Sequence, residues 1–192
     1  MRARIGTVLF LGAFFAITTN LAAQTAKSHP RVPLTLAFTW NGMAANTVGG
    51  SGFWMNGAGL QLHNQIWRGL GIVADIAGTH TGNMGSTGVG LDLLTVTFGP
   101  RYTWSRRRLR FYGQGLLGEG FGFNSLFPAS RGTTTSDDNF ATVTGGGVTR
   151  RISPRLGLRL FEADWVRTQL PNSTTDVQNN LRLSAGLILH FR

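Results

Sequence analysis

The 192-residue sequence contains no cysteine, which excludes disulfides, thiolate metal sites and a cysteine nucleophile. Charged residues are also scarce, at 14% of the chain against about a quarter in an average soluble domain. After the first 23 residues no apolar run is long enough to predict a membrane-spanning helix. Stability must therefore come from something other than cross-links, and burial in a membrane is one such source.

The first 23 residues have the pattern of a secretory signal peptide. Arg2 and Arg4 precede an apolar run at residues 8–17, and small residues lead up to Ala23. We predict cleavage after Ala23, a periplasmic N-terminal arm at residues 24–32 and a folded domain at residues 33–192. The alternative is an uncleaved anchor, but the run is shorter than the roughly 20 residues that a spanning helix needs.

The few charges that are present are strongly unbalanced. The formal net charge is +10, and nearly all of the positive charge is arginine. Basic proteins often bind nucleic acid, but these arginines cluster between predicted strands, as at residues 106–108 and 150–155, and form no stripe on a helix. Export also removes the usual nucleic-acid partner, so we expect no nucleic-acid binding and assign the arginine-rich turns to anionic lipid headgroups.

Glycine is abundant, with 27 residues, and much of the chain after residue 32 alternates between apolar and polar or small side chains. Residues 181–191 show this best, because every odd position is leucine, alanine or phenylalanine. A period of two is that of a β-strand. Eight segments of about ten or more residues have this character, a length that suits a tilted strand crossing a bilayer. They cover residues 33–43, 53–63, 68–79, 89–104, 109–121, 140–152, 155–168 and 179–191.

These segments predict an all-β fold, an eight-stranded antiparallel up-and-down transmembrane β-barrel. The connections alternate between short and long, and the longest is 122–139. This arrangement places the short turns and both termini in the periplasm and the long loops outside the cell. Aromatic residues near the strand ends are expected to form two girdles. They are Trp40, Trp54, Trp67, Tyr102, Trp104, Trp165 and Phe191. A soluble exported barrel such as a lipocalin, with its apolar positions inward, is the alternative fold.

Two of the segments break the alternation close to acidic residues. In residues 155–168, strict alternation would turn Glu162 and Asp164 toward lipid, which is costly. One extra residue near Leu160–Phe161 would return both to the lumen, so we predict a β-bulge there. A similar bulge at Leu116–Leu117 would bring Glu119 inside.

Several segments together resemble a known group of proteins. They are residues 98–102 (FGPRY), 111–118 (FYGQGLLG), 145–148 (GGGV), 156–168 (LGLRLFEADWVRT) and 178–191 (QNNLRLSAGLILHF). In these segments and their order, the chain resembles the OmpA-like small outer-membrane β-barrel superfamily, and within it the β-barrel-domain proteins common in acidobacterial genomes. The resemblance spans nearly all of the chain after the leader. It implies an eight-stranded, membrane-embedded barrel and no particular reaction.

The candidate site is a set of charged side chains at predicted lumen positions. The set comprises Asp75, Arg101, Arg110, Glu119, Arg159, Glu162, Asp164 and Arg182. An eight-stranded barrel is just wide enough for side chains to fill it, so charges inside must pair or stay hydrated. We interpret the set as a structural salt-bridge network that plugs the lumen. The alternative is a proton or ion path gated by re-pairing of Arg159 with Glu162 or Asp164.

We predict no catalytic, metal or cofactor site. The stretch Gly113–Gly118 fits G-x-G-x-x-G, but it lies inside a predicted strand with no helix after it, which a phosphate-binding loop would need. The four histidines are too scattered for a metal site. The enzymatic alternative is a lipid-modifying hydrolase centred on His80, with Asp75 below it and Thr81 and Ser86 nearby.

The sequence therefore predicts a non-enzymatic protein of a Gram-negative outer membrane, with a structural or surface-interaction role through its extracellular loops. A narrow passive channel for ions or small solutes is the other non-enzymatic alternative. The expected partners are outer-membrane lipid and lipopolysaccharide, together with the barrel-insertion machinery during assembly. We expect a monomer.

Overall fold

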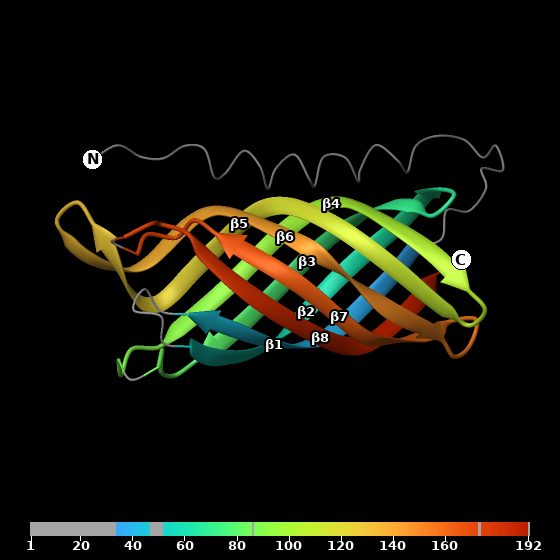
Figure 1. The fold of residues 1–192 in the computed structure, drawn as a ribbon, viewed down its shortest axis with the longest axis horizontal. Helices are drawn as coiled ribbons and strands as arrows, with labels where there is room; N and C mark the ends of the chain where they lie inside the picture. Colours follow the sequence, from blue (N-terminus) through green and yellow to red (C-terminus); the bar gives the residue numbers. More distant parts are fainter. Residues whose placement is uncertain (1–33, 47–51, 86, 173, 192) are drawn as a thin grey trace. The chain divides into compact units, whose positions relative to one another are not determined.

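Eight antiparallel strands follow one another around a closed barrel in the order of the sequence (Figure 1). The computed structural model describes residues 34–46, 52–85, 87–172 and 174–191, so the predicted signal peptide and N-terminal arm lie outside the described residues. The strands are β1 (Leu34–Asn46), β2 (Gly52–Trp67), β3 (Leu70–Thr81), β4 (Leu91–Arg106), β5 (Leu109–Ala129), β6 (Gly132–Arg151), β7 (Leu156–Thr168) and β8 (Gln178–Phe191). In the described ranges, no helix has the length and apolar character to cross a membrane.

The first and last strands close the barrel. β1 pairs with β8 in a register that sets Leu34 opposite Phe191 and Trp40 opposite Ala185. Closure gives every strand two hydrogen-bonded neighbours within the barrel wall, so an open edge remains only where the ends of β5 and β6 extend beyond β4 and β7. The predicted fold class, an eight-stranded antiparallel up-and-down barrel, is confirmed.

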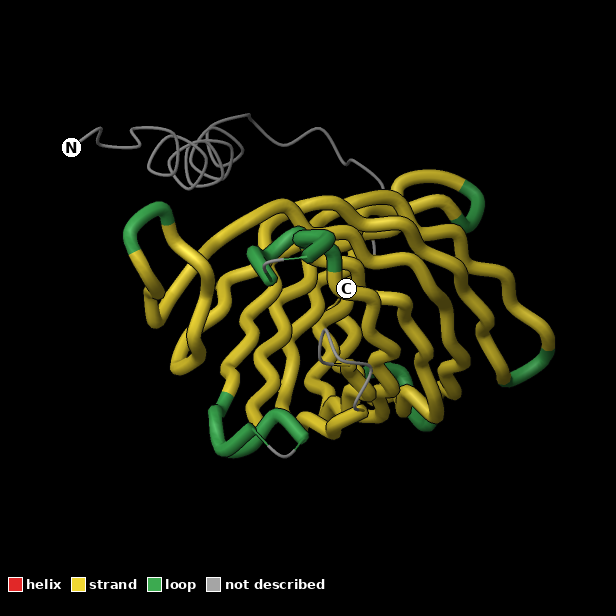
Figure 2. Tube along the Cα trace, turned by 60° about the vertical axis from the view of Figure 1, so that its left-hand side comes forward, coloured by secondary structure: helices red, strands yellow, loops and turns green. Residues whose placement is uncertain are grey.

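The two ends of the barrel differ in the length of their connections (Figure 2). Residues 68–69, 107–108 and 152–155 connect strands at one end, called here the short-turn end. Residues 82–90 and 169–177 connect strands at the opposite, long-loop end, where β5 and β6 are joined by residues 130–131 alone. The first short turn needs two residues of positive φ, and Arg68 (35°) and Gly69 (95°) supply them.

The prediction of a long loop at residues 122–139 is wrong. Most of residues 122–139 is strand, because β5 runs to Ala129 and β6 begins at Gly132. The resulting β5–β6 hairpin, yellow to orange, reaches beyond the other strands at the left of Figure 1. Polar and glycine-rich composition concealed this extension, since it lacks the apolar alternation of a membrane strand.

Apolar side chains cover the outside of the barrel. All seven aromatic residues expected in girdles are exposed, from Trp54 at 46% to Trp67 at 64%. At the short-turn end Trp104 stacks between Tyr102 and Phe111, with ring centroids 6.3 and 6.0 Å apart. The lipocalin-like alternative, with these side chains packed inside, is therefore wrong.

The predicted bulge in β7 is confirmed. Val148 of β6 pairs with Phe161 and the next residue, Thr149, pairs with Arg159, so Leu160 is the extra residue. The register with β8 shifts at the same place. As a result Leu160 and Phe161 both face outward, while Arg159 and Glu162 on either side are both buried in the lumen.

The predicted bulge in β5 at Leu116–Leu117 is wrong. The β4–β5 register is the same before and after it, with Phe98 opposite Leu117 and Arg101 opposite Gln114. Alternation therefore continues and turns Glu119 outward, where it is exposed. Glu119 is the eleventh residue of β5. A strand crosses a bilayer in about 9–11 residues, so a bilayer around this barrel would place its carboxylate at an interface and not at the costly centre.

Candidate functional site: the charged layer of the lumen

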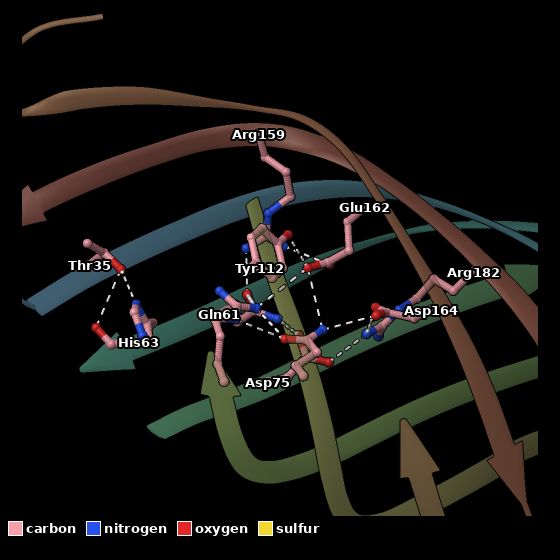
Figure 3. Close-up of polar contacts among 11 residues, drawn as sticks. Thr35, Gln61, His63, Asp75, Tyr112, Arg159, Glu162, Asp164 and Arg182 are labelled. Carbon is pink, nitrogen blue, oxygen red and sulfur yellow. Dashed lines mark hydrogen bonds and ion pairs between the residues drawn. The ribbon is translucent and has the colours of Figure 1, made fainter. Parts of the chain in front are cut away.

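Nine polar side chains at inward positions form one connected network, which we call the charged layer (Figure 3). Its members are Gln61, Asp75, Arg101, Tyr112, Gln114, Arg159, Glu162, Asp164 and Arg182. Three arginines balance three carboxylates, so the layer has no net formal charge. Each of the nine is buried, and burial of charge is tolerated only when the charges are paired and hydrogen-bonded.

Arg182 joins opposite walls of the barrel. Its Nη2 atom donates to Oδ2 of Asp75 on β3 and to Oδ2 of Asp164 on β7, at 2.9 Å in both cases. β3 and β8 are separated by two strands in the sheet, so the bond to Asp75 crosses the lumen. Asp164 is fully buried. Removing one partner of a buried ion pair leaves the other charge uncompensated, so breaking this pair is expected to lower the stability of the protein strongly.

Glu162 is the second centre of the layer. Its Oε1 accepts from Nη1 of Arg159 at 2.8 Å, and its Oε2 accepts from the hydroxyl of Tyr112 at 2.5 Å. Nη2 of Arg101 lies 3.6 Å from the same Oε2. The Arg101 guanidinium also lies over the Tyr112 ring, with Cζ 4.0 Å from the centroid, which adds a cation–π contact.

Two glutamines that were not predicted as site residues link these centres. Gln61 donates to Asp75 at 3.1 Å and accepts from Arg101 and Arg159. Gln114 donates to Asp164 at 3.0 Å and accepts from Arg101. Their parity along the strands is the signal that could have identified them, because both occupy the same face of their strands as the inward charges although neither is charged.

Two glycines of β6 make room for the layer. A Cβ at Gly147 would lie 2.5 Å from the Tyr112 hydroxyl, and a Cβ at Gly145 would overlap the backbone and carboxylate of Asp164. No side chain fits at either position without displacing a member of the network. The glycine-rich stretch of β6 is thereby explained by packing, and the role is structural.

Six of the eight predicted lumen charges belong to the charged layer, and the other two do not. Arg110 is half-buried near the short-turn end, where it lines the arginine-rich concavity described below. Glu119 faces outward, as described above. Among the described residues no cluster of three or more His, Asp or Glu side chains is arranged to hold a metal ion.

Toward the long-loop end the lumen lining changes from polar to apolar. We call this cluster the apolar cap; its members are Met43, Ala45, Met55, Leu93, Phe127 and Leu170. Phe127 comes from the β5–β6 hairpin and Leu170 from the β7–β8 connection, so each of these two segments contributes one side chain to the cluster. A register shift between Phe123 and Phe127, with Asn124 at a φ of 55°, turns Phe127 inward.

Some buried polar atoms of the lumen lack a protein partner. Among the described residues, both amide atoms of Asn41 and the hydroxyls of Thr97 and Ser184 make no hydrogen bond to protein. Asn41 and Ser184 lie opposite each other on β1 and β8. Buried polar groups of this kind usually bind water, so this part of the lumen has the chemistry of a hydrated site.

The structure does not place Asp75 beside His80, as the hydrolase alternative expected. Its side chain lies on the outer face of β3, where Nδ1 contacts Asp92 of β4, and Asp92 also accepts from Asn124. Asp75, expected below it, points into the lumen and binds Arg182. The Thr81 hydroxyl donates to the backbone carbonyl of Asn83 at 3.1 Å, and Ser86 lies outside the described residues.

Known proteins match this chain in structure but not in sequence. No family model matches the sequence, and no curated protein matches it. Ail, the attachment invasion locus protein of Yersinia pestis, is similar over 84% of this chain and all of its own, with a TM-score of 0.59 and 18% identity. Neisserial surface protein A is similar over 82% of this chain and 97% of its own, with a TM-score of 0.63 and 14% identity.

A third solved structure is similar in the same way. The outer membrane protein OprG from Pseudomonas aeruginosa matches 85% of this chain and 98% of its own, with a TM-score of 0.52 and 9% identity. These neighbours are small eight-stranded outer-membrane β-barrels. At such low identities the likeness establishes a shared fold alone, the small antiparallel barrel.

Proposed function

We propose that this protein is a monomeric, OmpA-like barrel of a Gram-negative outer membrane, exported by its signal peptide, that acts without catalysis. In this proposal the long-loop end faces the outside and carries a structural or surface-interaction role. Lipid and lipopolysaccharide surround the barrel, and the barrel-insertion machinery assembles it. The fold that it shares with small outer-membrane barrels supports the location.

The observation that carries the proposal is that apolar side chains lie on the outside of the barrel and charged side chains lie on the inside, the reverse of a soluble protein. Large apolar side chains cover the outside, whereas three arginines and three carboxylates occupy the inside. Such a surface would aggregate in water but matches a bilayer, where closed barrels satisfy every backbone hydrogen bond. The charge-balanced layer leaves no free charged group of its own for catalysis, which supports a structural interpretation.

Heat-modifiable migration tests the membrane part of the proposal. The purified chain, refolded in detergent micelles, is expected to migrate faster on SDS gels before boiling than after it, because a folded barrel resists SDS. A chain that stays monomeric in detergent-free buffer and shows no such shift would contradict it. Turnover of radiolabelled lipid A by the folded protein would contradict the non-enzymatic role.

A narrow channel is the second candidate, and the unpartnered polar atoms of Asn41, Thr97 and Ser184 favour it. Planar-bilayer conductance separates the two. The plugged barrel is expected to give no discrete openings, whereas a channel would open and would change its conductance when Arg159→Ala removes the bond to Glu162. Openings in the wild-type protein that disappear in this variant would establish the channel.

A further inference from the structure

The short-turn end carries a concavity of about 850 Å³ between the β4–β5 and β6–β7 turns. Five arginines line it: Arg107, Arg108, Arg110, Arg150 and Arg151. Four of them are exposed and Arg110 is half-buried. No acidic residue of the described chain contributes to the lining, so the positive charges are uncompensated.

The eight acidic residues of the chain are all placed elsewhere. Three are neutralised within the charged layer. The other five lie toward or at the long-loop end; they are Asp92, Glu119, Asp137, Asp138 and Asp176. The concavity is therefore a positive region that attracts anions, and like-charge repulsion among its arginines is relieved when an anion binds.

The β6–β7 turn holds its part of the concavity in a defined conformation. Backbone amides of Ile152 and Ser153 donate to the carbonyl of Leu156 at 3.0 and 2.9 Å. The Ser153 hydroxyl in turn accepts from the amide of Leu156 at 3.0 Å. A turn that is fixed in this way presents Arg150 and Arg151 at lower entropic cost than a free loop would.

One wall of the concavity is apolar and continues the outer surface of the barrel. Ile152 and Leu160 are about half exposed, at 55% and 47%, and Leu158 is partly exposed on the outward face of β7. The bulge in β7 contributes to this wall, since Leu160 is the extra residue that it turns outward. The site thus combines several guanidinium groups with a strip of hydrocarbon, which suits an amphiphilic anion.

We propose that this concavity binds an anionic phospholipid from the leaflet at the short-turn end. Guanidinium groups suit phosphate because their planar fork donates two parallel hydrogen bonds. The phosphodiester headgroup would lie among the arginines and an acyl chain along Leu158 and Leu160. The inference rests on the proposed function, because the protein must be in a bilayer for the lipid to reach the site. Inorganic phosphate or a soluble polyanion would leave the apolar wall unused, so the lipid is the occupant that fits both halves.

Native mass spectrometry of the full chain in detergent micelles measures this selectivity. Dioleoyl phosphatidylglycerol is expected to bind at least about tenfold more tightly than dioleoyl phosphatidylcholine, because the two share acyl chains and differ in net charge. Glycerol phosphate, which carries the charge without acyl chains, is expected to remain unbound at the same concentrations. Equal binding of the two lipids, or of glycerol phosphate and phosphatidylglycerol, would overturn the proposal.

A charge-matched pair of variants locates the site. Arg150→Gln with Arg151→Gln should weaken phosphatidylglycerol binding by about fivefold for each arginine removed. Arg68→Gln with Arg131→Gln removes the same charge from exposed turns outside the concavity and should leave binding unchanged. Equal weakening in both double variants would show that net charge alone attracts the lipid and would overturn the site.

Heat-modifiable migration of every variant separates this inference from the proposed function. A chain that inserts and shifts on the gel, but does not prefer the anionic lipid, overturns the inference and leaves the membrane barrel standing. A wild-type chain that does not shift on the gel overturns both. The comparison of the three ligands on the wild-type protein decides the question even if one of the double variants does not fold.

Discussion

The charged layer and the apolar cap fill the same lumen with opposite chemistry. The charged layer is built by strand residues on opposite walls, through directional bonds such as those of Arg182. The apolar cap depends partly on Phe127 and Leu170, which lie in a hairpin extension and a connection. Loss of one charged partner leaves a buried charge unpaired, whereas loss of an apolar partner leaves a cavity that neighbouring side chains can partly close.

The largest effect is expected from Asp164→Asn, which removes one charge from the buried centre of the layer. Arg182 would lose half of its ionic pairing, and breaking a buried pair lowers the free energy of unfolding by about 3–5 kcal/mol. Urea unfolding in phosphatidylcholine vesicles, followed by tryptophan fluorescence, measures the loss. Asp138→Asn, on the exposed β5–β6 hairpin, is the control and should change stability by less than about 0.5 kcal/mol. Similar losses in the two variants would mean that the buried pair contributes nothing special.

Phe127→Ala should have the next largest effect, because it removes the aromatic side chain of the apolar cap. Truncating a buried Phe costs about 3 kcal/mol at the lower end of the observed range, and the position of Phe127 on a hairpin that extends beyond the other strands favours that end. The same urea titration applies. Leu126→Ala changes the neighbouring outward residue and should cost clearly less. If the free energy of unfolding falls equally in both variants, the outward side chains of the hairpin contribute as much as Phe127, and the apolar cap is not a stabilising layer.

Tyr112→Phe tests the charged layer more gently, since it removes a hydroxyl and keeps the ring over Arg101. The lost hydrogen bond to the Glu162 carboxylate is expected to cost about 2 kcal/mol, as for other bonds to charged groups. Tyr102→Phe is the natural control, because Tyr102 is exposed on the outer face. An unchanged unfolding midpoint for Tyr112→Phe would indicate that water replaces the hydroxyl and that the layer is open to solvent.

Glu119→Gln should have the smallest effect and extends the comparison to the outside of the barrel. A carboxylate near the interface costs little, so the variant should change the free energy of unfolding by less than about 1 kcal/mol. Glu162→Gln alters the same type of side chain inside the lumen, and it should lower the free energy of unfolding several times more. A large gain in stability for Glu119→Gln would show that Glu119 lies deeper in the hydrocarbon than its place in β5 indicates.

Much of the architecture could be predicted, because the alternation of apolar and polar residues identifies each strand and its two faces without knowledge of the other strands. The β7 bulge was also predictable, since two carboxylates could return to the lumen only through an extra residue near Leu160. The same reasoning failed for Glu119 because alternation gives the side of the wall and not the depth in the bilayer. Phe127 was missed for another reason: the polar composition around it resembled a loop, and the register shift that turns it inward depends on pairing with β6.

The sequence by itself determined which side of the wall most residues face, because a period of two is a local property of an extended chain. The tertiary structure alone decided which inward residues meet. Asp75 and Arg182 are 107 positions apart and become partners only when closure brings β3 and β8 to opposite walls of one lumen. Such pairings depend on the strand tilt and stagger that closing a barrel of eight strands imposes, and no single strand carries that information.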